Sequence, residues 1–153
     1  MRKAVRFVCD EQLGRLARWL RLQGFDTVYR CPFPDTELLH CAQAEGRILI
    51  TRDGNLSAKT LFSSIVVIQS TDYQVQLAEL RRMVKAGKPR SFSRCLDCNE
   101  PIGAVAKEQA KGKVPEEVFK TYQEFYTCPS CRKIFWKGSH VKNSAKRLAR
   151  LSL

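Results

Sequence analysis

Acidic residues are scarce in this chain of 153 residues, which has 15 Asp and Glu against 27 Lys and Arg and a formal net charge of +12. Such an excess of positive charge favours a polyanionic partner over an acidic protein or a neutral metabolite. Long apolar runs are also missing, and nothing in the chain resembles a membrane span. The N-terminal MRKAVRFVCDE is too short, and too interrupted by Arg6, for a signal peptide. We therefore expect a cytoplasmic location and no membrane partner.

The seven cysteines are unusual for a secreted chain and ordinary for a metal protein in a reducing compartment. Two C-x-x-C pairs, CLDC and CPSC, are separated by 29 residues and contain Cys95, Cys98, Cys128 and Cys131. This spacing suits a zinc ribbon, in which four thiolates complete the tetrahedral coordination of a structural Zn²⁺ ion. Two disulfides are the alternative. The other cysteines lack such spacing, and we expect them to be packed thiols: Cys9, Cys31 and Cys41.

The chain divides near residue 90, where AGKPRSFSR lacks apolar periodicity and is typical of a linker. We expect an α/β domain over residues 1–90, a zinc ribbon over residues 91–142 and a basic tail over residues 143–153. A module of about 50 residues buries too little surface to fold alone, whereas structural zinc contributes on the order of 10 kcal/mol or more of folding free energy. The second domain is therefore expected to depend on its metal.

Strand and helix patterns alternate along the first domain. Strands are predicted at residues 4–9, 27–29, 48–51 and 65–68, and helices at residues 13–23, 37–45 and 73–85. Alternation of this kind implies right-handed crossovers and a mostly parallel sheet with helices on both faces. In open sheets of this class, ligands bind at the carboxyl ends of the strands.

Each predicted strand leads into an aspartate: Asp10, Asp35, Asp53 and Asp72. Carboxylates gathered at one edge repel one another unless a cation neutralises them, and oxygen ligands of this kind suit Mg²⁺ or Mn²⁺. Two such ions can activate water and stabilise the leaving oxygen in phosphodiester cleavage. Asp10 and Asp53 directly follow their strands and fit the ligand role best. Asp35 and Asp72 fit equally well as caps of the helices that follow them.

Arginines lie opposite the apolar face of the first predicted helix. This helix begins just after the first aspartate, so we expect Arg15 and Arg18 to border the acids and to hold a substrate phosphate. Arg21 is expected to be a surface residue. Arg52, next to the third aspartate, either binds substrate as well or pairs with the acids.

The segments FVCDEQLGRLARWLRLQGFDT, DTELLHCAQAEGRILITRD, RCLDCNEPI and YTCPSCRKIFWKGSH resemble the PIN-like ribonuclease family that is named for the C-terminal domain of the mutator-seven exonuclease. The resemblance covers most of residues 4–141. It implies a PIN-like nuclease domain with an appended zinc ribbon, metal-dependent action on RNA, and Mg²⁺ or Mn²⁺ ligands at Asp10, Asp35 and Asp53. Where relatives often place adjacent acids, this chain reads RCPFPDT, so the middle ligand is either Asp35 or Glu37.

Residues 132–150 contain seven basic residues and no acid. Within this segment, the candidates for phosphate contacts are Lys137, Lys142, Lys146 and Arg147. Phe135 and Trp136 either stack on an unpaired base or fill the small core of the ribbon. The sequence SAKRLARLSL predicts a short basic amphipathic helix that becomes ordered on RNA or on a protein partner.

These patterns predict a metal-dependent ribonuclease that acts on RNA, with tRNA, rRNA and the ribosome as candidate partners. The alternative is a noncatalytic RNA-binding or ribosome-associated protein that keeps the nuclease fold. Both hypotheses predict RNA binding. They differ in whether the acids bind a divalent metal and whether RNA is cut.

Overall fold

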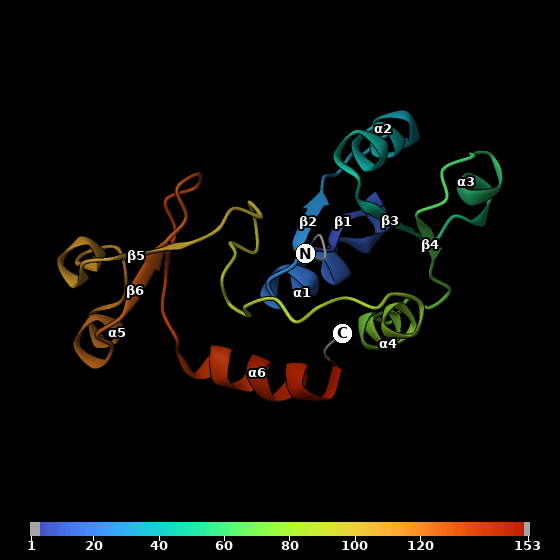
Figure 1. Ribbon diagram of the computed structural model, residues 1–153. Coiled ribbons are helices and arrows are strands. Elements are labelled where there is room, and N and C mark those ends of the chain that lie inside the picture. The colour runs from blue at the N-terminus through green and yellow to red at the C-terminus, as the bar shows by residue number, and fades with distance from the viewer. Residues whose placement is uncertain (1–3, 152–153) are drawn as a thin grey trace.

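A parallel sheet forms the N-terminal half of the protein (Figure 1), in a computed structural model that describes residues 4–151. Its strands are β1 (Arg6–Cys9), β2 (Asp26–Tyr29), β3 (Ile48–Thr51) and β4 (Ile65–Val67). They pair in parallel in the order β2-β1-β3-β4. The predicted α/β class, with a parallel sheet flanked by helices, is confirmed.

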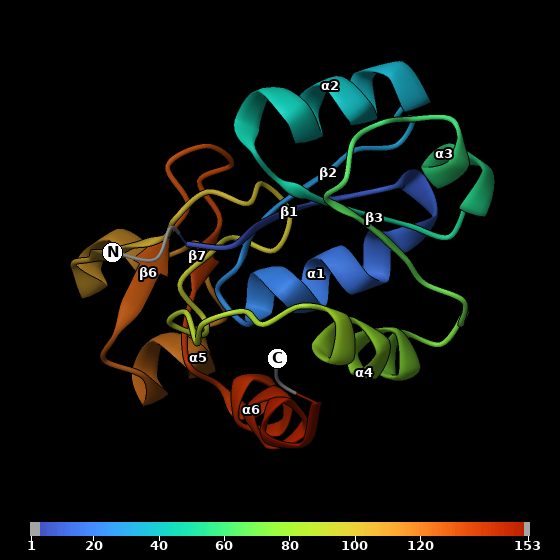
Figure 2. The ribbon, with the colours of Figure 1, turned by 45° about the vertical axis from the view of Figure 1, so that its right-hand side comes forward.

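Helices cover both faces of this sheet (Figure 2), with α1 (Gly14–Leu22) and α4 (Tyr73–Met83) on one face and α2 (Asp35–Glu45) and α3 (Gly54–Ala58) on the other. Successive strand residues point to opposite faces. Accordingly, Phe7 and Ile50 pack against α1 and α4, whereas Val8 and Leu49 pack against α2 and α3. Burial on both faces explains the continuous apolar runs within β1 and β3.

Local signals set several helix ends. Gly46 adopts a left-handed conformation, with φ of 60°, and ends α2. The Asp72 side chain accepts hydrogen bonds from the backbone N–H groups of Gln74 and Val75 at the start of α4. A 3-10 turn, η1 (Glu11–Leu13), precedes α1, and α2 begins earlier than its apolar pattern predicts.

An antiparallel sheet forms the C-terminal half, with β5 (Gly103–Val105), β6 (Phe125–Thr127) and β7 (Ile134–Phe135) in that order. The turn η2 (Lys107–Ala110) and helix α5 (Glu116–Thr121) lie between β5 and β6. Helix α6 (Ser139–Leu151) then returns beneath the first domain and contacts α4 (Figure 1). It begins within the predicted ribbon and continues into the predicted tail without a break. No helix within residues 4–151 is both long and apolar enough to cross a membrane.

Candidate active site and metal centre

The side chain of Thr51 links the aspartates that follow two neighbouring strands, β1 and β3. Its hydroxyl donates to Asp10 Oδ2 at 2.8 Å and accepts from the backbone N–H of Asp53 at 2.9 Å. The other oxygen of Asp10 accepts from the backbone N–H of Glu11 at 2.6 Å, and the residue is only 7% exposed. The structure therefore brings Asp10 close to the backbone of Asp53 at the carboxyl edge of the sheet.

Asp53 also caps α3, because its Oδ1 accepts from the backbone N–H of Asn55 at 2.8 Å. Asp35 lies in the exposed first turn of α2, where Pro34 is the cap residue and makes no side-chain cap hydrogen bond. The alternative that Asp35 caps α2 is therefore wrong, whereas the alternative that Asp72 caps α4 is confirmed.

Glu37 lies in the same exposed turn as Asp35 and is 3.8 Å from the guanidinium of Arg30. Among the described residues, three or more Cys, His, Asp or Glu side chains converge within ligand distance of one another only at the four cysteines. The structure therefore does not bring three of the predicted carboxylates within that distance of one another.

Glu11 had no predicted role, although it directly follows the first aspartate in the sequence FVCDE. Its Oε2 accepts from the backbone N–H of Phe33 at 3.2 Å, and its backbone carbonyl accepts from the Tyr29 hydroxyl at 2.9 Å. Gly14 permits this contact, since a Cβ there would lie 2.7 Å from the Tyr29 hydroxyl. Glu11 thus fixes the loop between β2 and α2 beside the sheet edge.

The arginines of α1 have different environments. Arg15 is exposed, and its guanidinium lies 4.1 Å from the centre of the Tyr73 ring. Arg18 forms an ion pair with Asp97 of the C-terminal half. The prediction that Arg21 lies on the surface is wrong: it is 4% exposed and donates to the backbone carbonyls of Thr27 at 2.9 Å, Leu96 at 2.7 Å and Asp97 at 3.0 Å.

Arg52 follows the strand-end threonine and is partly buried. Its Nε atom is buried and has no hydrogen-bond partner among the described residues. A buried donor without a partner is costly, and a ligand oxygen would satisfy it.

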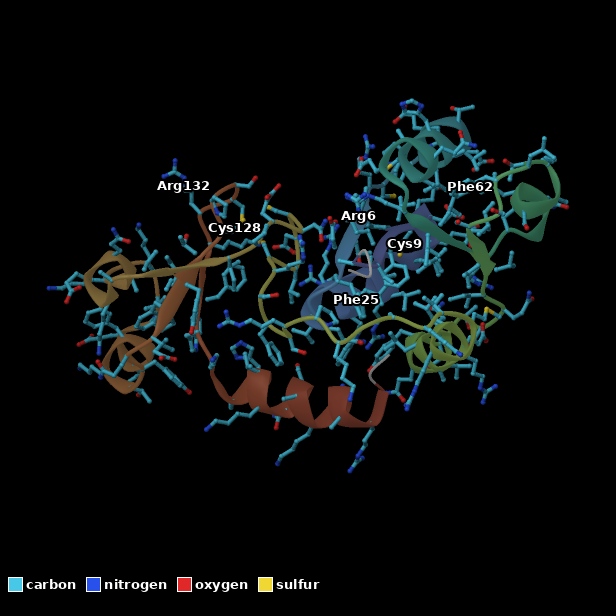
Figure 3. All side chains as sticks on the ribbon, in the orientation of Figure 1. Arg6, Cys9, Phe25, Phe62, Cys128 and Arg132 are labelled. Atoms are coloured by element: carbon cyan, nitrogen blue, oxygen red, sulfur yellow. The ribbon has the colours of Figure 1, made fainter. Side chains whose placement is uncertain are left out.

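The four cysteines converge as predicted, with their sulfur atoms all within 4.8 Å of one another. All seven cysteines lie within the described residues and are free thiols, so the structure contains no disulfide between them. Cys9 and Cys41 are packed as expected, whereas Cys31 is exposed. Figure 3 shows Cys9 in the parallel sheet, apart from Cys128 in the ribbon.

The backbone around each cysteine pair folds into a knuckle. In the first knuckle (residues 94–101), Cys95 N–H donates to the Glu100 carbonyl at 2.8 Å, and Asn99 turns with φ of 66°. In the second knuckle (residues 128–133), Cys128 N–H donates to the Lys133 carbonyl at 3.1 Å, and Arg132 turns with φ of 62°. The same turn therefore follows the second cysteine of each pair.

This donor set fits a tetrahedral Zn²⁺ ion, which four thiolates coordinate without an open position. Without a cation, burial raises the pKa of Cys95 to about 12, despite backbone hydrogen bonds that act in the opposite direction. A hydrogen bond from the backbone of Lys133 lowers the pKa of Cys131 to about 7. A bound cation would stabilise all four thiolates, and its uptake would release protons.

The first knuckle is docked on the edge of the parallel sheet. The Asn99 side chain accepts from the backbone N–H of Thr27 at 2.9 Å and donates to Asp26 Oδ1 at 2.7 Å. Arg47 donates to the same carboxylate oxygen at 2.7 Å. Together with the bonds from Arg21, these contacts join the cysteine centre to β2 and α1.

Of the predicted phosphate contacts, Lys137 follows β7, and the rest lie on α6: Lys142, Lys146 and Arg147. All of them are exposed. Phe135 and Trp136 are half-buried. The rings of Trp136 and His140 pack edge to face, with their centroids 5.8 Å apart.

A family model described as the Mut7-C RNAse domain matches residues 5–148. The chain belongs to this family. The match includes the parallel sheet, both knuckles and most of α6, so the cysteine centre lies within the Mut7-C domain. Membership of the Mut7-C family indicates a ribonuclease-type function. No curated protein and no solved structure matches the chain.

Proposed function

We propose that this Mut7-C protein is a divalent-metal-dependent ribonuclease that cleaves RNA phosphodiester bonds at the carboxyl edge of its parallel sheet. The observation that carries the proposal is the pair of hydrogen bonds through which the Thr51 hydroxyl joins Asp10 to the backbone of Asp53. Ligands of open parallel sheets bind at this edge. The family match supports RNA as the substrate.

Asp10 and Asp53 would hold Mg²⁺ or Mn²⁺, with Asp35 or Glu37 as a further ligand. The donors fit, because a carboxylate oxygen that accepts one hydrogen bond keeps a second lone pair for a hard cation. When bound, such ions activate water and stabilise the leaving oxygen in phosphodiester cleavage. The Thr51 hydroxyl orients the Asp10 carboxylate for this role.

Arginines beside the acids would hold the phosphate. The unpartnered Nε of Arg52 supports this role, because a guanidinium presents a fork of donors to phosphate oxygens. Arg15 is exposed in the first turn of α1 and is the other candidate. Arg18 is already paired with Asp97, which makes it a positioning residue for the first knuckle in this proposal. The structural zinc ribbon and α6 would add further phosphate contacts.

The alternative is a noncatalytic RNA-binding or ribosome-associated protein that uses the same basic surface. One observation favours it. Asp10 and Asp53 both accept backbone N–H bonds at the start of helical turns, and this capping accounts for both acids without a metal.

A cleavage assay separates the two functions. Wild type, Asp10→Asn and Asp53→Asn are incubated with structured and single-stranded RNA, with Mg²⁺, with Mn²⁺ and with chelator. Asp72→Asn is the matched control, because Asp72 caps α4 as Asp53 caps α3. Zinc content is measured in every sample, because a chelator also competes for the ribbon metal.

The ribonuclease proposal expects divalent-dependent cutting by wild type and by Asp72→Asn, and its loss in the other variants. Equal, chelator-resistant background cutting by all of these proteins, with RNA binding intact, would reject the ribonuclease. It would favour the noncatalytic RNA-binding or ribosome-associated protein.

A further inference from the structure

A cavity of about 390 Å³ lies where α1, the first knuckle, β7 and α6 meet. This volume is within the range of about 300–1,000 Å³ that is typical of small-molecule sites. Both tryptophans of the chain line it, Trp19 from α1 and Trp136 from the residue after β7. Phe92, Tyr126 and Phe135 add further rings to its wall.

The charged side chains that line the cavity are all basic. Arg18, Arg94 and Lys137 line it, and no Asp or Glu of the described residues is among its lining side chains. Arg18 and Arg94 already bind protein oxygens, Arg18 at Asp97 and Arg94 at the carbonyls of Gly24 and Asn99. Lys137 is exposed at the cavity, with its ammonium 5.9 Å from the Tyr126 ring. A ligand with an aromatic body and an attached anion matches this arrangement.

We propose that this cavity takes an unpaired nucleobase of the RNA, with the adjoining phosphate at Lys137. The proposal rests on the proposed function, which supplies RNA as the ligand. Unpaired bases stack on aromatic side chains, whereas a base inside a duplex cannot reach a recessed ring. The exposed Lys142 of α6 extends the cationic surface beyond the cavity.

Helix α1 connects this cavity with the carboxyl edge of the sheet. Its first residue, Gly14, lies four positions after Asp10, and its last, Leu22, lines the cavity. The cavity-lining residues of α1 run from Arg18 to Leu22, about 6–12 Å from Gly14 at a rise of 1.5 Å per residue. At about 3.4 Å per stacked nucleotide, this distance corresponds to roughly two to four nucleotides. The bound base would therefore lie a few nucleotides from the scissile phosphate.

The position of both tryptophans makes base binding directly measurable. Full-length protein is titrated with adenosine 5′-monophosphate while tryptophan fluorescence is recorded, and ribose 5-phosphate serves as the ligand that has the phosphate and lacks the base. The proposal expects saturable quenching by the nucleotide only. Equal responses to both compounds would overturn it, because they would report phosphate binding without a base.

Two variants test the cavity from opposite directions. Trp136→Leu removes a stacking surface, and Ser144→Phe fills the cavity from α6 without removing a ring. Tyr122→Leu is the control, since Tyr122 is a half-buried ring of the ribbon that does not line the cavity. Loss of one stacked base weakens binding of a single-stranded RNA oligonucleotide by about 5- to 150-fold.

We expect this loss in both cavity variants and not in Tyr122→Leu. Circular dichroism and zinc content establish that each variant is folded. If Trp136→Leu does not fold, Ser144→Phe decides, and wild-type affinity in folded Ser144→Phe would overturn the proposal.

Failure of this proposal differs from failure of the ribonuclease. Metal-dependent RNA cleavage without quenching by the nucleotide would reject the base site and leave the enzyme intact. Base-dependent quenching that Ser144→Phe abolishes, in a protein that cuts no RNA, would support the base site and reject the enzyme.

Discussion

The Thr51 hydroxyl donates a hydrogen bond of 2.8 Å to Asp10 Oδ2. Thr51 is fully buried, and the same hydroxyl accepts from the backbone of Asp53 at 2.9 Å. Because Thr51 and Asp10 are both buried, this hydroxyl determines how the Asp10 carboxylate is oriented relative to the end of β3. An apolar residue of the same shape would fit the space and lose the orientation.

Thr51→Val is therefore expected to lower cleavage by about 10- to 100-fold, the usual effect of removing a partner that orients a metal-binding group. It should also lower the free energy of unfolding by about 1–3 kcal/mol, because the Asp53 N–H loses its acceptor. Cleavage rates and urea unfolding measure the two effects. Thr51→Ser keeps the hydroxyl and should retain most activity; an equally inactive Thr51→Ser would point to packing as the cause.

Much of the first domain could be predicted from the sequence. Strand β3 (Ile48–Thr51) was predicted with its observed bounds, because a strand buried on both faces is a continuous apolar run that ends sharply at polar residues. Helices α3 and α5 were not predicted. They contain five and six residues, too few to display an apolar period.

The candidate site was predictable only in part. The aspartates at strand ends follow from strand order, whereas the role of Thr51 depends on how two neighbouring strands are aligned. Arg21 was misassigned for a similar reason. Its helical position predicts a solvated face, but its partners Leu96 and Asp97 lie 75 and 76 residues away in the sequence. Periodicity within one helix carries no information about a surface that a distant segment covers.

Substitutions at two arginines of α1 should have different effects, one mainly on stability and the other mainly on RNA binding. Arg21→Met removes the donor to the buried carbonyl of Thr27 and to the partly buried carbonyl of Leu96, and an unsatisfied buried group costs about 1–3 kcal/mol. Arg15→Met changes an exposed side chain and should alter stability by only about 0.5–1 kcal/mol while weakening RNA binding. Thermal unfolding and RNA titrations of both variants provide the comparison. Equal destabilisation by the two substitutions would contradict the buried role of Arg21.

Stability should depend on the ionisation of Asp26. Burial alone would raise the pKa of this carboxyl, but hydrogen bonds from Arg47 and Asn99 outweigh burial and hold the pKa below its usual 3.8. The ionised group therefore stabilises the fold fully above pH 3.8, and this contribution is lost as the pH falls through the lower pKa of the folded state.

Asp26→Asn should accordingly lower the free energy of unfolding by about 2 kcal/mol near pH 7, with a smaller difference from wild type below about pH 4. Urea unfolding across this pH range tests the prediction. Asp35→Asn, at an exposed acid, is the control for the substitution and should leave the free energy of unfolding within about 0.5 kcal/mol of wild type. A difference from wild type that stays constant down to about pH 3 would show that ionisation of Asp26 is not the cause.

The exposed lysines of α6 are expected to bind RNA phosphates. Reversing Lys142 and Lys146 to Glu should reduce the slope of log affinity against log salt by about 0.7–0.9 for each phosphate that the protein no longer neutralises. Lys137 and Arg147 should add to this effect when they are reversed as well. Reversal of the exposed Lys111 and Lys113 changes the net charge equally and serves as the control. If both double variants shift the slope alike, net charge explains the effect and α6 has no specific part in binding.

Metal binding at the four cysteines should stabilise the β2 edge of the parallel sheet as well as the ribbon. We expect about one zinc ion per chain, because four thiolates complete one tetrahedral site. Cys98→Ser removes a ligand from the first knuckle, whose Asn99 side chain accepts the backbone N–H of Thr27.

Zinc loss in this variant should therefore unfold the ribbon and raise hydrogen exchange at Thr27, while the buried amides of β1 and β3 stay protected. Cys31→Ser, at an exposed thiol outside the centre, should change neither zinc content nor exchange. Protection of Thr27 that persists in zinc-free Cys98→Ser would show that the knuckle holds its shape without metal, since this amide reports its docking on β2 directly.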